Sequence, residues 1–401
     1  MRIVQVGTGS VPVQPGVTGG AEKYIHYLSA ALQRLGHQVT VIDMPAGPDA
    51  PSPYRRLEVP LRWRHASNML AHAVRGLLFG RAAARQLERL IRAGDVDVVN
   101  FHGQFTGVTG IPIARRYGVP AVFTMHNPLW SDPAACQSPL KRTKFWLERR
   151  AEAQASAVIG LSDTVTDHRT RYFGLSPARA AMIPVGVDDF WFEPRPASRR
   201  VKEKYSPDGV PLILLVGRMA SYKNQLALAQ ALPRLRAAVP NARSVFVGPQ
   251  DSSPYLRRVR AAVAEAKAEA HVIFAGAVPL DELAQLYGLA QVLVLPSLQE
   301  NCPQALLEAM AQGKAIVASD IPPVREVLPE GTAELVPPLD HGALAETLIR
   351  LLGDDHARFE LGLRARQRAY DVYRWERVSS RVAEVYKRLT RRSAEAARGV
   401  S

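Results

Sequence analysis

The chain has 401 residues, 47% of them hydrophobic and 22% charged, so we expect two domains of roughly 200 residues, each with its own core. The sequence contains no apolar run of about 18 residues, which argues against a membrane-spanning helix. The two cysteines, Cys136 and Cys302, exclude a disulfide framework and a cysteine-based metal cluster. The first strand-like run follows no secretory leader, so we expect a cytoplasmic protein with reduced thiols.

The formal net charge is +14, and much of the excess lies between Arg55 and Arg92, where nine arginines accompany two acids. Leucine and aromatic side chains, among them Trp63 and Phe79, are interleaved with the arginines, a composition that suits an anionic membrane surface. Solvated helix faces on an arginine-rich chain are the alternative. A second basic cluster spans residues 141–150. No recognised motif accompanies the charge, so nucleic acid is not an expected partner.

Apolar runs typical of buried strands alternate with helical patterns along the chain, which predicts an α/β fold of parallel sheets covered by helices on both faces. In the first half we expect strands near Ile3–Val6, Val39–Ile42, Val96–Phe101, Ala121–Met125, Ala157–Gly160 and Ala181–Pro184. In the second half we expect them near Leu212–Val216, Ser244–Val247, Val272–Phe274, Val292–Leu295, Ala315–Ala318 and Glu334–Val336.

This pattern predicts two doubly wound domains, at residues 1–189 and 211–372. The proline-rich, basic composition of residues 190–210 predicts a linker, and residues 373–401 are expected to form a C-terminal helix that packs back towards the N-terminal domain. Ligands of open α/β sheets bind at the carboxyl ends of the strands, so two facing domains would form a cleft along the linker.

Three candidate features of the first half follow strands. Gly19 and Gly20 lie in a loop that opens the first helix, where glycines let the backbone and a ligand approach closely. The dinucleotide fingerprint is absent, because Gly7–Thr8–Gly9 lacks a third glycine at the required place. His102 and His126 end neighbouring strands, so we expect them to face the same site. Their spacing to other polar residues does not suggest metal ligands.

In the second half, Arg218 and Lys223 lie in the loop after the first strand, where an arginine and a lysine can neutralise a diphosphate without a metal. Glu300 and Glu308 flank a strand-to-helix junction eight positions apart. The first amides of that helix, at Gln304, Ala305 and Leu306, are oriented to attract a phosphate. A surface loop with ordinary cations and a capped helix with two solvated glutamates are the alternatives.

Taken in order, these motifs resemble those of family 4 retaining glycosyltransferases, over nearly the whole chain. The resemblance is carried by Gly19–Gly20, His126, residues 183–188, Gly217–Arg218 with Lys223, Glu300 to Glu308, and residues 313–319. It implies a GT-B fold, with two Rossmann-like domains, an active-site cleft between them and no essential metal or cofactor.

The resemblance also implies roles for single residues. Arg218 and Lys223 would bind the diphosphate of a UDP- or GDP-sugar, Glu300 the sugar hydroxyls and Glu308 the ribose. Further donor contacts are expected from Asn301, Gln304, Ala305 and Leu306 in the second half and from Gly19 and Gly20 in the first. His126 would lie near the transferred sugar and, less directly, His102 on the acceptor side.

The activity implied is transfer of a hexose-type sugar, with retention, to a hydroxyl of a glycan, glycolipid or small molecule. This chain has Cys302–Pro303 where many members have Phe–Gly, so one backbone donor is missing from the donor loop. An epimerase or phosphorylase of the same fold is an alternative, although Lys387 has no context that suggests a pyridoxal-binding lysine. A non-catalytic module that binds anionic lipid through residues 55–92 is another.

Overall fold

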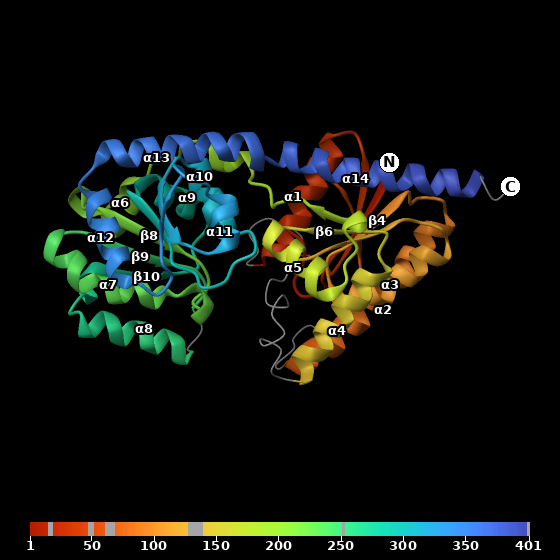
Figure 1. Cartoon of the computed structure of the whole chain (residues 1–401), viewed down its shortest axis with the longest axis horizontal. Helices are drawn as coiled ribbons and strands as arrows, with labels where there is room; N and C mark the ends of the chain where they lie inside the picture. Colours follow the sequence, from red (N-terminus) through yellow and green to blue (C-terminus); the bar gives the residue numbers. More distant parts are fainter. Residues whose placement is uncertain (15–18, 47–51, 61–68, 127–138, 251–252, 399–401) are drawn as a thin grey trace. The chain divides into compact units, whose positions relative to one another are not determined.

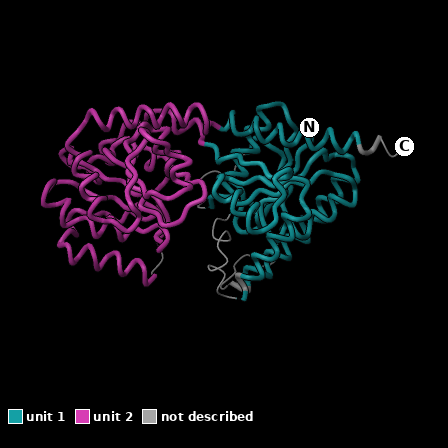
Figure 2. The backbone as a smooth tube through the Cα atoms, in the orientation of Figure 1, with its two compact units in different colours: residues 1–186, 375–401 teal, residues 187–374 magenta. Residues whose placement is uncertain are grey.

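A computed structural model describes residues 1–398 except 15–18, 47–51, 61–68, 127–138 and 251–252. It divides into two compact units, shown in teal and magenta in Figure 2. Unit 1 comprises residues 1–186 and 375–401, and unit 2 comprises residues 187–374. The chain therefore returns to unit 1 for its last helix.

Strands and helices alternate through both units (Figure 1). The strands are β1 Arg2–Val6, β2 Gln38–Asp43, β3 Arg55–Glu58, β4 Val98–Phe101, β5 Ala121–Thr124, β6 Ala157–Gly160, β7 Ala180–Met182, β8 Leu212–Val216, β9 Arg243–Val247, β10 Val272–Gly276, β11 Val292–Leu295, β12 Ala315–Ser319 and β13 Glu334–Val336. The α-helices are α1 Gly20–Arg34, α2 Met69–Arg92, α3 Gln104–Arg116, α4 Pro139–Gln154, α5 Asp163–Phe173, α6 Arg199–Tyr205, α7 Gln225–Ala238, α8 Pro254–Glu265, α9 Leu280–Leu289, α10 Gln304–Ala311, α11 Pro322–Val327, α12 His341–Leu352, α13 Asp355–Arg368 and α14 Trp375–Arg398.

Unit 1 contains a parallel sheet with the strand order β3-β2-β1-β4-β5-β6-β7. Successive side chains on a strand point to opposite faces, so each strand contributes to two layers. Val4 and Val6 of β1 pack in a core with Phe79 of α2 and Ile111 of α3. On the opposite face of the sheet, α14 packs beside α1 and against β4.

Unit 2 contains a second parallel sheet, with the order β10-β9-β8-β11-β12-β13. Ile213 and Val294 of its central strands lie in a core with Leu228 of α7 and Leu348 of α12. In both units the strand order reverses beside the first strand, between β1 and β4 and between β8 and β11. Such a switch point is where open α/β sheets bind ligands, at the carboxyl ends of the strands.

The predicted α/β class and all the predicted strands are confirmed, but the sequence analysis missed one strand. Arg55–Glu58 forms β3, a parallel edge strand beside β2. The segment contains two arginines and a glutamate, so it lacks the apolar run typical of a buried strand. An edge strand packs less of its surface, and charged side chains are tolerated there.

The structure places the domain limits differently from the sequence analysis. The segment predicted as a linker, residues 190–210, lies within unit 2 and contains α6. Tyr205 of α6 is buried, and its hydroxyl donates to Glu282 of α9 at 2.6 Å. The prolines of this segment lie before and after α6 and not within it, so they are compatible with the helix. The proline content of the segment therefore did not show that it is an extended linker.

Candidate functional site

Two loops at the switch point of unit 2 bring Lys223 and Glu300 together. Lys223 follows β8 and Glu300 follows β11, and these strands are hydrogen-bonded neighbours. The Lys223 Nζ atom lies 2.6 Å from Glu300 Oε1, with 19% and 8% of the two side chains exposed. The amide of Leu298 donates to the carbonyl of Tyr222 at 2.7 Å, which links the two loop backbones.

The loop after β8 presents Arg218 to solvent. Gln225 is buried, and its Nε2 donates to the Arg218 carbonyl at 2.8 Å, which holds the backbone of the loop. Asn224 adopts a left-handed conformation, with φ of 51°, and its side chain donates to the Pro338 carbonyl at 2.9 Å. Within the described part of the chain, the exposed Arg218 guanidinium makes no hydrogen bond or ion pair. Its charge is therefore available to a ligand.

Helix α10 begins at Gln304. Pro303 is the N-cap residue and not part of the first turn, so Gln304 and Ala305 are the first two helical positions. The amide of Leu306 donates to the Pro303 carbonyl at 3.1 Å, and its side chain is buried. Of the three amides predicted to attract a phosphate, the one at Leu306 is thus engaged within the helix. Asn301 is buried in the loop before the cap.

Glu308 lies in the second turn of α10 and is buried, so it is not a solvated surface carboxylate. The hydroxyl of Tyr287, on α9, donates to Glu308 Oε2 at 2.9 Å. Burial and the neighbouring carboxylate raise the pKa of Tyr287 well above its usual value. The sequence analysis missed Tyr287, because a tyrosine in an apolar helix carries no signal that distinguishes it from a core residue.

In unit 1, the structure brings His102 and His126 into contact. They follow β4 and β5, which are adjacent, and His102 Nδ1 lies 2.9 Å from His126 Nε2. Burial lowers the pKa of both rings, that of His126 to about 3, so both are neutral at neutral pH. Tyr24 of α1 packs its ring edge-on against His126, with centroids 5.0 Å apart.

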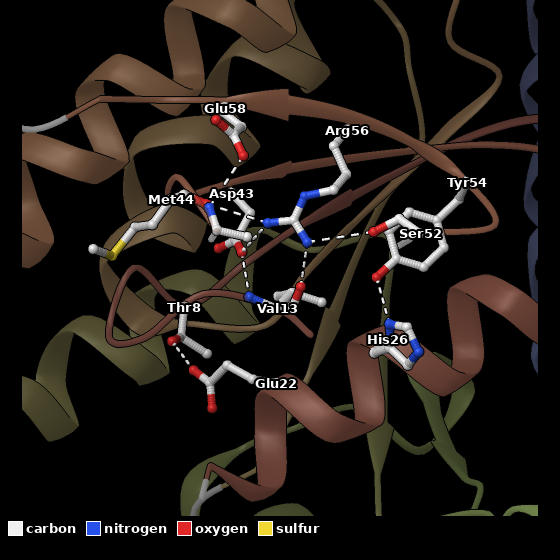
Figure 3. Close-up of polar contacts among 11 residues, drawn as sticks. Thr8, Val13, Glu22, His26, Asp43, Met44, Ser52, Tyr54, Arg56 and Glu58 are labelled. Atoms are coloured by element: carbon white, nitrogen blue, oxygen red, sulfur yellow. Dashed lines mark hydrogen bonds and ion pairs between the residues drawn. The ribbon is translucent and has the colours of Figure 1, made fainter. Parts of the chain in front are cut away.

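The glycine loop of unit 1 holds a carboxylate at the start of α1 (Figure 3). Glu22 is buried and accepts a hydrogen bond from the Thr8 hydroxyl, and its burial raises its pKa. A Cβ atom on Gly19 would collide with this carboxylate, whereas one on Gly20 would meet nothing. Gly19 is therefore required for the placement of Glu22, and Gly20 leaves open space at the helix N-terminus.

A second polar cluster of unit 1 surrounds Asp43 at the end of β2 (Figure 3). Asp43 Oδ2 accepts a hydrogen bond from the Val13 amide and lies 3.5 Å from the Arg56 guanidinium. Burial raises the pKa of Asp43 to about 7 despite the attraction of Arg56. On α1, His26 contacts the Tyr54 hydroxyl at 2.8 Å, and burial lowers the pKa of this histidine to about 4.

The basic segment 55–92 divides into internal and exposed arginines. Arg56 pairs with Asp43, and Arg75 is buried and donates to the Gly9 carbonyl at 3.1 Å. Phe79 is in the core, so it is not available to a surface ligand. Along α2, Val74, Leu77 and Leu78 are exposed and are followed by exposed Arg81, Arg85, Arg89 and Arg92. Arg62, Trp63 and Arg64 lie outside the described residues.

The second basic cluster, on α4, is partly structural. Arg169 of α5 is fully buried and pairs with Glu148 at 2.8 Å and Glu152 at 3.2 Å, both on α4. Arg149 of this cluster donates to the Phe173 carbonyl at 3.1 Å and so links α4 to the end of α5. No helix among the described residues is long and apolar enough to cross a membrane.

Comparison with known proteins gives matches along almost the whole chain. The family model described as Glycosyltransferase Family 4 matches residues 18–189, and the model described as Glycosyl transferases group 1 matches residues 198–370. The MMP alpha-(1->4)-mannosyltransferase of Mycolicibacterium hassiacum is 29% identical over 94% of this chain and 96% of its own. A GDP-mannose-dependent alpha-(1-6)-phosphatidylinositol monomannoside mannosyltransferase of Mycolicibacterium smegmatis is 28% identical over 80% and 84%.

Solved structures share the architecture. Sucrose-phosphate synthase from Thermosynechococcus elongatus superimposes with a TM-score of 0.78 at 22% identity, over 96% of this chain and 98% of that one. Anabaena Alr3699/HepE in complex with UDP and glucose gives 0.75 at 18% identity, over 96% and 99%. The two parallel, Rossmann-like domains have the architecture of the GT-B fold. The chain belongs to the family 4, group 1 glycosyltransferases.

Proposed function

We propose that this enzyme is a retaining glycosyltransferase that moves a hexose-type sugar from a nucleoside diphosphate carrier to an acceptor hydroxyl. The observation that carries the proposal is the Lys223–Glu300 pair at the switch point of unit 2, beside the exposed Arg218. A lysine and an arginine suit a diphosphate, and a carboxylate at the same place suits sugar hydroxyls. The relative named for GDP-mannose and the related fold solved with UDP support a nucleotide sugar as the donor.

In the proposed donor complex, Arg218 and Lys223 bind the diphosphate, and the N-terminal end of α10 adds amides from Gln304 and Ala305. Glu300 accepts hydrogen bonds from the sugar. Lys223 then lies between two anions, the Glu300 carboxylate and the diphosphate, and orders both. Glu308 accepts from the ribose hydroxyls while Tyr287 fixes its carboxylate.

The proposed transfer occurs on one face of the sugar. The bond between the anomeric carbon and the diphosphate oxygen breaks, the acceptor oxygen bonds to the same face of that carbon, and the departing phosphate takes the acceptor proton. Arg218 and Lys223 stabilise the negative charge that grows on the diphosphate, which is the largest demand of the step. No side chain has to act as a strong base, and the two cations take the place of a metal ion.

We place the acceptor and the transferred sugar near the carboxyl ends of the strands of unit 1, at His126 and His102. The exposed apolar residues of α2 and the arginines that follow them favour a second partner, an anionic membrane surface. Such a surface would suit a lipid-linked or glycolipid acceptor, reached by a cytoplasmic enzyme at the inner face of the membrane.

The test is thermal unfolding of the full chain with UDP, GDP and ADP, followed by consumption of the matching sugar nucleotides. A nucleotide at 100 times its dissociation constant adds about 2.7 kcal/mol, which raises the midpoint by several degrees. The matched control is the nucleoside without its diphosphate, which we expect to stabilise far less. If no sugar nucleotide stabilises the protein or is consumed, the proposed function is wrong.

A further inference from the structure

The two histidines of unit 1 belong to a longer chain of buried hydrogen bonds that begins in the middle of β1. Gln5 is fully buried, and its Oε1 lies 2.7 Å from His102 Nε2. His102 Nδ1 in turn lies 2.9 Å from His126 Nε2. Within the described part of the chain, His102 is the sole hydrogen-bond partner of the His126 ring. Among the residues that the structure describes, the chain of contacts therefore ends at His126.

Helix α14 supplies the other end of this chain. Its Tyr386 is fully buried and accepts hydrogen bonds from Gln5 Nε2 at 3.3 Å and from Asn100 Nδ2 at 2.9 Å. Asn100 Oδ1 accepts from the Thr124 hydroxyl at 3.0 Å. Gln5, Asn100 and Thr124 come from β1, β4 and β5, which are adjacent, and each interrupts an apolar strand with a polar side chain. Buried polar groups of this kind are retained only when they are paired.

The direction of these bonds follows from the donors and acceptors available. Gln5 directs its amide group to Tyr386, so its carbonyl oxygen is the group that faces His102 and can only accept. His102 must then carry its proton on Nε2, which leaves Nδ1 as an acceptor. His126 donates to that acceptor from its own Nε2. A neutral His126 is therefore unprotonated at Nδ1.

We propose that Gln5, His102 and Tyr386 are positioning residues that hold His126 in a single tautomer, with Nδ1 presented as a hydrogen-bond acceptor to a hydroxyl of the transferred sugar. The sugar contact rests on the proposed function, whereas the tautomer does not. The opposite tautomer would present an N–H group, which cannot accept from a hydroxyl proton. Helix α14 follows unit 2 in the sequence but belongs to unit 1. It thereby sets the tautomer of a ring in its own unit.

The tautomer is measured directly by long-range proton–nitrogen NMR of the full chain labelled with nitrogen-15 histidine. The His126 signals are assigned by their loss in His126→Gln. We expect the nitrogen-15 chemical shift of Nδ1 to be that of an unprotonated imidazole nitrogen and the chemical shift of Nε2 to be that of a protonated one. Gln5→Met keeps the length of the side chain and removes the acceptor, so we expect a mixture of both tautomers. A wild-type spectrum with the proton on Nδ1 would overturn the proposal.

Steady-state kinetics test the positioning role. In Gln5→Met we expect kcat for transfer to fall about tenfold, the loss of one hydrogen bond, while the dissociation constant for UDP or GDP stays unchanged. His102→Asn keeps an acceptor near the position of Nδ1 and should retain more activity than His102→Leu. Tyr386→Phe should shift the His126 signals towards the mixture, whereas the neighbouring exposed Lys387→Ala should not.

The outcomes separate the inference from the proposed function. A wild-type protein that consumes no sugar nucleotide defeats the proposed function, and the NMR shifts of Gln5→Met and Tyr386→Phe then decide the tautomer alone. An active enzyme in which Gln5→Met alters neither the His126 spectrum nor kcat defeats the inference and leaves the proposed function standing. Circular dichroism and the midpoint of thermal unfolding show whether each variant is folded.

Discussion

Lys223 and Glu300 form an ion pair of 2.6 Å although they are 77 positions apart in the chain. The two residues meet because β8 and β11 are parallel neighbours in the sheet, so the loops that follow them leave the same edge of the sheet. Both side chains are mostly buried, so each charge depends on the other or on a ligand for its stabilisation. The arrangement is preformed, which would lower the cost of ordering the site in the proposed donor complex.

We expect Glu300→Ala to lower transfer at least 100-fold, because in the proposed donor complex this carboxylate binds the reacting sugar. Transfer is measured as acceptor-dependent release of nucleoside diphosphate. The control is Glu265→Ala, which removes an exposed carboxylate at the end of α8 in the same unit and should leave the rate unchanged. Near-normal turnover of a folded Glu300→Ala would remove Glu300 from the site.

Loss of both cations should weaken nucleotide binding. Each charge-assisted contact contributes about 1.5–3 kcal/mol, so Arg218→Ala with Lys223→Ala should raise the dissociation constant for UDP or GDP at least 100-fold. Isothermal titration measures this change. Arg234→Ala, an exposed arginine of α7, is the matched control and should bind as the wild type does. Unchanged affinity in the double variant would contradict the diphosphate assignment.

Asp43 predicts a pH dependence of stability in unit 1. Burial raises its pKa to about 7, whereas an aspartate in an unfolded chain ionises near pH 4. Between about pH 4 and pH 7 the folded state binds more protons than the unfolded state, so this residue makes the free energy of unfolding fall as the pH rises, by up to about 1.4 kcal/mol per pH unit.

Urea unfolding of the wild type and of Asp43→Asn across that range isolates this contribution. The asparagine keeps an acceptor for the Val13 amide and does not titrate. The stability of Asp43→Asn relative to the wild type should therefore increase from pH 4 to pH 7. Parallel curves for the two proteins would show that Asp43 does not hold a proton in this range.

The exposed face of α2 predicts binding to anionic vesicles. Leu77→Ser with Leu78→Ser removes apolar surface that would enter the lipid interface, so sedimentation with phosphatidylserine vesicles should decrease. The control is Leu339→Ser, an exposed leucine of unit 2. Binding should also weaken as salt rises, because the Debye length is about 10 Å at 0.1 M. Equal binding to neutral vesicles at high salt would contradict an electrostatic contact.

The proposed leaving-group stabilisation uses Arg218 and Lys223, so EDTA should leave the rate of transfer unchanged. The measurement compares initial rates with and without the chelator, and then after addition of Mn²⁺. A strict requirement for the metal would show that the two cations do not neutralise the diphosphate by themselves.

The sequence by itself determined the alternation of strands and helices, because fully apolar runs such as Val292–Leu295 have few alternatives to a strand buried on both faces. It also indicated which loops hold the candidate site, since Arg218, Lys223 and Glu300 each follow such a run. The edge strand β3 and the helix α6 were not predicted, because their sequences are polar and their stability comes from neighbours distant in sequence.

Only the tertiary structure decided which of these side chains meet. The sequence showed Glu300 and Glu308 as two carboxylates eight positions apart. In the structure Glu308 is buried against Tyr287, whereas Glu300 pairs with Lys223. Gln5 and Tyr386 lie 381 positions apart, and neither belongs to a motif that indicates function. They meet because α14 returns to pack on unit 1. Hydrogen-bond partners and desolvation depend on distances through space, which local patterns of residues do not contain.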